Sequence, residues 1–354
     1  MIGPPVQIGD RLVGPGRPCF VVAEAGVNHD GDLAAAKQLV RAAAEARADC
    51  VKFQLFKAEE VASAAAPKAA YQLETTDPGE SQLAMLKRLE LAEDALPELV
   101  DEARRAGLEF LCSCYSEREL DLLADLGVPA FKFASAQIVE LPFLSYAARQ
   151  GKPILLATGM ATLDEIEEAI ATVRGQGDPS VVLLQCTTNY PAPLEDANLR
   201  AIATMAKRFG VPVGYSDHTL GDTAAIASVA CGAVVLEKHL TLDRALPGPD
   251  HRSSLEPDEF EMLVRRVREV EAVLGSDRKE PAPSERANAE RMRRSLFAAA
   301  DIPAGTTITA DHLVTRRPYI GLPPRLLPEV VGSTAKVDIP SDTPISLDLL
   351  TREP

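Results

Sequence analysis

The sequence contains no tryptophan, only 5% aromatic residues and too little positive charge to balance its acids. Lys and Arg together number 37 against 52 Asp and Glu, which gives a formal net charge of −15. An acidic chain is repelled by phosphate backbones and anionic lipids, so we expect neither nucleic acid nor a membrane as a partner. The sequence also has no apolar run of about 18 residues, the length that would predict a membrane-spanning helix.

Cysteine and the common cofactor motifs are scarce as well. Six cysteines scattered over 354 residues are too sparse for a disulfide framework. The N-terminal segment lacks the pattern of a secretory signal, so we expect a cytoplasmic protein with reduced thiols. Cys112 and Cys114 have no second cysteine pair to complete a metal site, and we interpret them as core residues. The sequence also lacks GxGxxG after a strand, a P-loop and HExxH, so it gives no support to dinucleotide, Walker-type or zincin chemistry.

Short apolar runs alternate with stretches of helical spacing, which is typical of a parallel-sheet protein. Eight such runs occur, and eight parallel strands close a (β/α)8 barrel. The runs are 20–26, 50–56, 108–113, 130–134, 153–158, 181–186, 211–215 and 233–239. We therefore predict an α/β chain with a TIM barrel over residues 1–275.

The remaining chain differs from the barrel in composition. Residues 276–290 are charged, contain proline and have few apolar positions, which predicts a linker. Residues 291–354 hold short β-rich runs separated by Pro-Ala-Gly and Pro-Ser-Asp turns, which predicts a small β-rich domain. A domain of this size is marginally stable alone, so we expect it to dock onto a barrel or a second subunit.

Polar residues fall where the predicted strands end, at the face where TIM barrels carry their active sites. They are Glu24, Lys52, Gln54, Ser113, Lys132, Ser135, Thr158, Tyr190, Ser216, His218, Glu237 and His239. Lys52 and Lys132 lie within apolar strands, where burial of a charge is costly without a partner. Both an anionic ligand and a salt bridge to a neighbouring Glu would satisfy them. We favour a phosphate or carboxylate ligand because two such lysines occur in one barrel.

Two histidines follow consecutive strands, His218 in GYSDHTLG and His239 in EKHLTLD. Neighbouring strands lie about 4.8 Å apart, so the two imidazoles could bind one metal ion, although two satisfied core histidines would also fit. Nitrogen and oxygen ligands favour Mn²⁺ or Mg²⁺ over structural zinc. His29 and His251 lie in loops beside carboxylates, where a hydrogen-bonding or titrating role and a plain turn are both open.

The ordered motifs AEAGVNHDGD, DCVKFQLF, FKFAS, ILLATGM, CTTNYPAP, GYSDHTLG and EKHLTLD resemble the N-acetylneuraminate (sialic acid) synthase family. The tail RRSLFAAADIPAGTTITADHLVTRRP is similar to the antifreeze-like SAF domain of that family. The resemblance implies a transferase that condenses phosphoenolpyruvate with an N-acetylated hexose, forms a 3-deoxy-nonulosonate and releases phosphate. It also implies a Mn²⁺- or Mg²⁺-dependent homodimer in which the SAF domain of one chain caps the site of the other.

Carried over by position, the resemblance implies metal ligands at His218 and His239. The residues that match contacts to phosphoenolpyruvate are Lys52, Lys132, Ser113, Ser135 and Ser216. Those that match groups around the acceptor sugar and the reacting carbons are Glu24, Gln54, Tyr190, Glu237 and Asp250, with Arg317 lent by the partner's SAF domain. We predict Glu24, Lys52, Lys132 and Glu237 as the catalytic residues, with water activated either by a carboxylate such as Glu24 or by a metal-bound hydroxide.

The sequence departs from the family pattern near the acceptor. Gln137 stands where the sialic acid enzymes usually carry an acid, and Thr188 replaces an Asn, both at expected substrate-binding positions. Ala157 replaces a Ser and Tyr319 a Gly. The resemblance implies N-acetylmannosamine or, as in legionaminate synthases, a 6-deoxy diacetamido analogue as the acceptor, and these departures leave the choice between sugars open. A non-catalytic carbohydrate-binding paralogue and a phosphoenolpyruvate aldol synthase for a different aldehyde are the alternatives.

Overall fold

The computed structural model describes residues 3–351, and these separate into two compact units that divide between Gly275 and Ser276. The first unit begins with a hairpin of β1 (Val6–Ile8) and β2 (Arg11–Val13). Its centre is a closed barrel in the order β10-β3-β4-β5-β6-β7-β8-β9, with every neighbouring pair parallel. The predicted TIM barrel is therefore confirmed.

The eight barrel strands lie within or close to the apolar runs that predicted them. They are β3 (Phe20–Gly26), β4 (Cys50–Leu55), β5 (Glu109–Cys114), β6 (Phe131–Phe133), β7 (Ile154–Ala157), β8 (Val181–Cys186), β9 (Val213–Asp217) and β10 (Val235–His239). Side chains of alternate residues point to opposite faces of each strand. One set packs under the helices and includes Cys112 and Cys114 in the main apolar core, as predicted.

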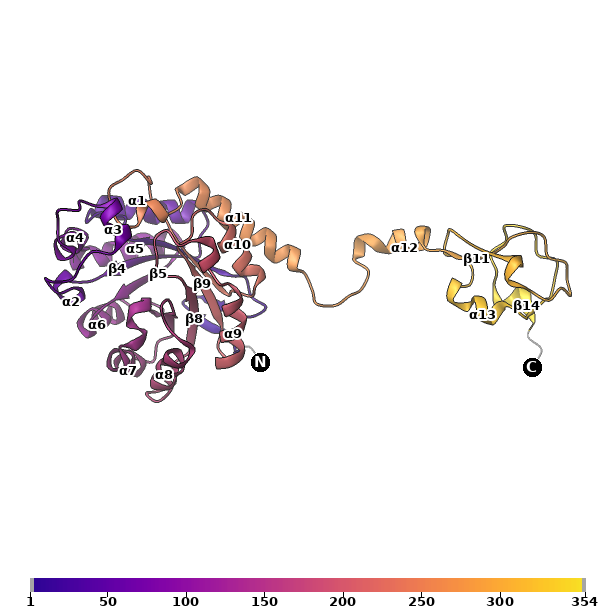
Figure 1. Cartoon of the computed structure of the whole chain (residues 1–354), viewed down its shortest axis with the longest axis horizontal. Coiled ribbons are helices and arrows are strands. Elements are labelled where there is room, and N and C mark those ends of the chain that lie inside the picture. The colour runs from indigo at the N-terminus through magenta and orange to yellow at the C-terminus, as the bar shows by residue number, and fades with distance from the viewer. Residues whose placement is uncertain (1–2, 352–354) are drawn as a thin grey trace. The chain divides into compact units, whose positions relative to one another are not determined.

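The helices that follow the strands surround the barrel (Figure 1). They are α1 (Leu33–Glu45), α5 (Leu96–Arg105), α6 (Glu117–Asp125), α7 (Leu141–Arg149), α8 (Leu163–Arg174), α9 (Arg200–Phe209), α10 (Thr223–Ala230) and α11 (Pro257–Leu274). Most of them present an apolar stripe to the strands and a polar face to solvent, whereas α10 is apolar almost all round. At the start of α8, Thr162 N donates to Glu165 Oε2 (2.7 Å), which is half of a reciprocal cap. Among residues 3–351, no helix is both long and apolar enough to cross a membrane.

The longest connection between barrel strands, residues 56–108, carries three extra short helices. They are α2 (Ala58–Val61), α3 (Ala70–Thr75) and α4 (Gln82–Arg88). Lys68 holds this β4–β5 insertion together, because its nearly buried amine donates to Thr76 Oγ1, Asp77 O and Glu80 Oε1 at 2.9, 2.7 and 3.1 Å. The sequence patterns did not predict these helices, which are too short to show a hydrophobic period.

The second unit is a small β-rich domain with its own core of Leu296, Ile302, Ile308, Ile339 and Ile345. Its strands pair antiparallel, β11 (Ser295–Ala298) with β12 (Leu313–Arg316) and β13 (Thr334–Ala335) with β14 (Leu350–Thr351). Its helices are α12 (Arg286–Met292) and α13 (Leu327–Val330). Helix α12 begins inside the segment expected to be an irregular linker, because RANAERM consists mainly of good helix formers.

Short 3₁₀ helices complete the described chain. They are η1 (Glu93–Ala95), η2 (Ser135–Val139), η3 (Leu194–Asp196), η4 (His251–Ser253), η5 (Pro283–Glu285), η6 (Ala310–His312), η7 (Pro324–Leu326) and η8 (Leu347–Leu349). Two of them, η2 and η4, contain or adjoin residues that the sequence assigns to a site. Both lie at the face of the barrel where β6 and β10 end.

Candidate active site

A pocket of about 210 Å³ opens at the carboxyl ends of the barrel strands. Nearly all of the site residues expected from the sequence line it. They are Glu24, Lys52, Gln54, Ser113, Lys132, Ser135, Thr188, Tyr190, Ser216, His218, Glu237, His239 and Asp250. These side chains come from distant parts of the sequence and meet because the barrel closes β10 against β3.

Four charged side chains meet at the base of the pocket. Lys52 Nζ lies 2.7 Å from Glu24 Oε2 and 3.7 Å from Glu237 Oε2, while Lys132 Nζ lies 3.4 Å from Glu237 Oε1. All four side chains are at most 5% exposed. The salt-bridge alternative for the two lysines is thus present in the structure. Because the same amines also face the pocket, we expect an anionic ligand to bind at these ion pairs.

The two carboxyl groups differ in their pKa, although burial opposes the ionisation of both. For Glu24, burial outweighs the attraction of Lys52 and raises the pKa above its usual value. For Glu237, burial is outweighed by Lys132, Lys52 and the Ser216 hydroxyl, which donates to Oε1 at 2.9 Å, and the pKa falls to about 2. Neighbouring carboxyls with divergent pKa values are suited to different roles, one exchanging a proton and the other remaining charged.

The two histidines approach each other from β10 and the end of β9, with ring centroids 5.5 Å apart. His218 Nδ1 lies 2.8 Å from Thr187 O, and this contact assigns the ring proton to Nδ1 and leaves Nε2 as the acceptor. His239 Nδ1 is buried without a hydrogen bond, and burial holds the pKa of this ring well below its usual value. Tyr190 stacks on His218 at a centroid distance of 4.0 Å.

The His239 ring fits a metal ion, because an imidazole with an unprotonated nitrogen is the form that binds divalent metals. The His218 contact with Thr187 O is the kind of second bond that orients a metal-binding ring. Among residues 3–351, no three His, Cys, Asp or Glu side chains form a metal cage by themselves. An ion bound here would take its other ligands from water or substrate.

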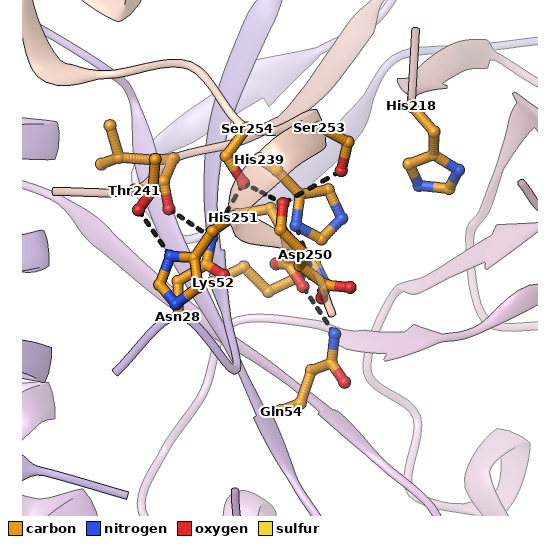
Figure 2. A network of polar contacts seen from close by, with 12 residues as sticks. Asn28, Lys52, Gln54, His218, His239, Thr241, Asp250, His251, Ser253 and Ser254 are labelled. Atoms are coloured by element: carbon orange, nitrogen blue, oxygen red, sulfur yellow. Dashed lines mark hydrogen bonds and ion pairs between the residues drawn. The ribbon is translucent and has the colours of Figure 1, made fainter. Parts of the chain in front are cut away.

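The loop after β10 carries Asp250 and is held by a network of polar contacts (Figure 2). Ser253 Oγ and Ser254 Oγ donate to Asp250 O at 3.0 and 2.7 Å, and Asn28 Nδ2 donates to Ser254 Oγ at 2.9 Å. This ties the loop to the one after β3. The Asp250 carboxylate lies 3.8 Å from His239 Nδ1, and burial raises its pKa to about 6.

His29 and His251 are buried hydrogen-bonding residues and do not line the pocket. His251 lies between Thr241 Oγ1 (2.7 Å) and Asp30 Oδ2 (3.2 Å), and so links the loops after β10 and β3. His29 Nδ1 accepts from Gly31 N at 3.0 Å. Of the alternatives that the sequence left open for these two histidines, the hydrogen-bonding one fits the structure.

Gln137 does not line the pocket, contrary to its assignment as a substrate-binding residue. Its Nε2 donates to Cys114 O (2.9 Å) and its Oε1 accepts from Ala134 N (2.9 Å), so both ends of the amide are bonded to the backbone. An ionised carboxylate here could not donate to Cys114 O as the amide does. Arg317 belongs to the second unit, directly after β12.

Sequence reasoning missed one wall of the pocket. This wall is formed by the β4–β5 insertion together with the loops after β3 and β5, through Val27, Tyr71, Gln72, Met85, Leu86, Leu89 and Tyr115. The available signal was the length of the β4–β5 connection, since long loops at the carboxyl face of a barrel commonly contribute to binding sites. No residue pattern within the connection distinguishes the pocket-lining positions.

The fold and site together define a TIM-barrel enzyme with ionisable groups gathered at the carboxyl ends of its strands. The NeuB family profile matches residues 39–279, and the SAF domain profile matches residues 293–351. The chain belongs to the NeuB family, as the sequence motifs indicated.

Named relatives extend over almost the whole chain. The N,N'-diacetyllegionaminic acid synthase of Legionella pneumophila is 41% identical over 95% of both chains. The human N-acetylneuraminate-9-phosphate synthase is 38% identical, over 96% of this chain and 95% of its own. The crystal structure of the N-acetylneuraminic acid synthetase of Leptospira borgpetersenii, in complex with citrate, superposes with a TM-score of 0.74 at 32% identity, covering 82% of this chain and 96% of the other.

The neutral state of His29 predicts a pH-dependent stability. Burial lowers the pKa of this ring from 6.5 to about 4, so between these values the unfolded chain binds a proton that the folded chain does not. The contribution of the neutral His29 ring to the free energy of unfolding is complete above pH 6.5 and is lost as the pH falls toward 4. We expect the free energy of unfolding, measured by chemical denaturation, to fall between pH 7 and pH 4 by about 3 kcal/mol more in the unaltered protein than in the His29→Asn variant. Asn keeps an acceptor for Gly31 N, and parallel pH profiles would contradict the assignment.

Proposed function

We propose that this chain is a sialic-acid-type synthase, a transferase that joins phosphoenolpyruvate to an N-acetylated hexose. The products are a 3-deoxy-nonulosonate and inorganic phosphate. The observation that carries the proposal is the pair of buried lysines beside two unequal carboxyls at the base of a barrel pocket. The legionaminate and sialate synthases among the relatives support the same chemistry.

The lysines and three serines provide the proposed donor site. The ammonium groups of Lys52 and Lys132 would neutralise the phosphate and carboxylate of phosphoenolpyruvate. Ser113, Ser135 and Ser216 surround the same space. Ser135 Oγ already accepts from Gly159 N at 3.0 Å, so its hydroxyl proton remains to be donated to an anion. This arrangement positions the enol without covalent attachment.

The bond-forming steps need a nucleophilic carbon, a proton donor and an activated water. The methylene carbon of phosphoenolpyruvate attacks the aldehyde carbon of the open-chain sugar, and the new alkoxide takes up a proton. Water then adds to the cationic carbon that bears the phosphate ester. Phosphate leaves with cleavage of that carbon–oxygen bond and yields the ketone.

Glu24 is the carboxylate we assign to water activation. Its raised pKa makes it a better base than Glu237, and Gln54 Nε2 donates to Oε1 at 3.1 Å and orients it. Glu237 stays ionised and would stabilise the cationic carbon and the neighbouring ammonium groups.

We assign His218 and His239 to a divalent ion, Mn²⁺ or Mg²⁺. When bound, such an ion would polarise the aldehyde oxygen as a Lewis acid. The neutral His239 ring and the Thr187 contact that orients His218 support this assignment. The protein would then exclude water with Tyr190, which covers both rings at centroid distances of 4.0 and 5.6 Å.

The wall of the pocket from the β4–β5 insertion is the proposed acceptor side. Met85, Leu86 and Leu89 offer apolar contact, and Gln72 offers an amide. Thr188 and Asp250 add polar groups elsewhere along the pocket lining. Such a mixed surface suits a hexose with N-acetyl groups, either N-acetylmannosamine or a 6-deoxy diacetamido analogue.

We further propose a cytoplasmic homodimer in which the second unit of one chain supplies Arg317 to the partner's pocket. The acidic composition and free cysteines are compatible with that location. In the described part of the first unit, no arginine lines the pocket. An arginine from another chain would supply the donor that a sugar hydroxyl or carbonyl needs.

The reaction itself predicts a product of defined mass. Phosphoenolpyruvate and Mn²⁺ incubated with a panel of N-acetylated hexoses should release phosphate and yield the nonulosonate from one member. Lys132→Met should lower kcat/KM by about 100-fold or more, because one ammonium at the donor anion is lost. The matched control Lys152→Met, whose amine donates to Val128 O, should retain activity.

Three outcomes of the panel decide between functions. Phosphate release coupled to a nonulosonate supports the proposal. Binding of phosphoenolpyruvate without turnover on any sugar would favour a different aldehyde. Binding of a sugar alone, with neither phosphoenolpyruvate nor metal, would favour a non-catalytic carbohydrate-binding paralogue.

The metal assignment predicts that His218→Ala with His239→Ala abolishes Mn²⁺ binding, followed by electron paramagnetic resonance, and reduces turnover at least about 100-fold. A thermal melt would check that the barrel stays folded. His312→Ala, in the second unit, is the matched control and should bind Mn²⁺ normally. Undiminished Mn²⁺ affinity in the double variant would place the ion elsewhere.

The dimer proposal predicts complementation between two impaired chains, measured at a sugar concentration well below the KM of the Arg317→Ala chain. Arg317→Ala should raise KM for the sugar about 10-fold or more and leave KM for phosphoenolpyruvate unchanged. Mixing Arg317→Ala chains with Lys132→Met chains should restore activity, because one pocket of each mixed dimer is intact. If Arg317 acts within its own chain, mixing restores nothing. Arg325→Ala serves as the control in the same unit.

A further inference from the structure

Asp217 and Lys238 form an ion pair that the proposed chemistry does not use. Lys238 Nζ lies 2.9 Å from Asp217 Oδ2, and both side chains are 0% exposed. The two residues are register partners at the ends of β9 and β10. Their neighbours Ser216, His218 and Glu237 line the pocket. Strand alternation therefore turns Asp217 and Lys238 away from the pocket, toward the surrounding helices.

Stability does not account for this pair. The outward positions of barrel strands are otherwise apolar, as at Val213 and Leu236, and a fully buried ion pair is often no more stabilising than apolar residues of the same volume. The pair is explained instead by the backbone groups it binds. Asp217 Oδ1 accepts from Thr219 N at 2.9 Å, and Lys238 Nζ donates to Thr219 O.

Thr219, whose backbone N–H and C=O are bonded to Asp217 and Lys238, directly follows His218. The peptide that joins His218 to Thr219 has both polar atoms bonded, since His218 O accepts from Ala192 N at 2.8 Å. Tyr215 adds a further contact, as its hydroxyl lies 3.2 Å from Asp217 Oδ1. Lys238 in turn immediately precedes His239 on β10. One ion pair thus joins the backbone segments that carry the two facing imidazoles.

We propose that Asp217 and Lys238 are positioning residues that hold the strand ends of β9 and β10 so that His218 and His239 face one metal ion. The inference rests on the proposed metal site. Two ligands from different strands must be kept within about 0.5 Å of the productive geometry, and the cross-strand pair supplies that restraint. Neither residue touches the ion or the substrate.

The test compares Mn²⁺ dissociation constants of the full-length protein, measured by electron paramagnetic resonance. The double variant Asp217→Asn with Lys238→Met removes both charges and keeps the side-chain volume. We expect its dissociation constant to rise about 10- to 100-fold, the usual effect of losing groups that orient metal ligands. Its melting temperature should stay near that of the unaltered protein.

A matched control pair lies where β4 begins, at the other end of the barrel. Arg268 Nη2 is 2.7 Å from Asp49 Oδ2 in a half-buried ion pair. Asp49→Asn with Arg268→Met should leave the Mn²⁺ dissociation constant unchanged. A second readout is turnover: the Asp217–Lys238 variant should regain kcat at saturating Mn²⁺, which a general loss of folding would not permit.

The outcomes separate this inference from the metal proposal. If the unaltered protein binds Mn²⁺ and the double variant binds it equally well, the positioning role is wrong. If the unaltered protein binds no Mn²⁺, the metal site and this inference fall together. If the double variant shows no cooperative melt, the single variant Asp217→Glu tests the positioning role instead. It keeps both charges of the ion pair but displaces the carboxylate. We expect about 10-fold weaker Mn²⁺ binding from it, and unchanged binding would overturn the inference.

Discussion

Mutual neutralisation of buried charges is the constraint on which the pocket depends. Two ammonium groups and two carboxylates occupy a space from which water is almost excluded, and any one of them alone would be strongly disfavoured there. They come from four different strands, β3, β4, β6 and β10. The barrel must therefore close correctly before the charges can compensate one another. The site therefore depends on the fold, since these charges without barrel closure would each be buried or solvated without their partners.

The same compensation determines what the pocket can accept. An anionic ligand must compete with Glu24 and Glu237 for the two lysines, so binding is favourable only when the ligand offers more negative charge or better geometry than a carboxylate. A molecule with both a phosphate and a carboxylate meets this condition, because it can engage both ammonium groups at once. The unequal pKa values of Glu24 and Glu237 then separate a proton-exchanging group from a permanently charged one without any change of residue type.

The sequence predicted the features that depend on period and topology, and failed where a contact depends on the local path of the backbone. Lys52 and His239 could be placed in one pocket because strand ends meet at one face of a barrel. The amide of Gln137 could not be placed, because its partners are the backbone atoms of Cys114 and Ala134, and no residue pattern encodes such partners. Tyr71 was missed because its position depends on an insertion held together by Lys68. The helix in the segment expected to be a linker was missed because seven residues are too few to show a hydrophobic period.

The β4–β5 insertion has a further consequence for how this family can diversify. The insertion supplies much of one wall of the pocket, yet much of its cohesion comes from its own contacts, such as those of Lys68 with Thr76 and Glu80. Substitutions along this segment can reshape the wall while the strand ends beneath keep their residues and spacing. Descendants of one ancestral barrel could thus change the sugar they use by drift in a single loop, and inherit the carbon–carbon bond-forming step unaltered.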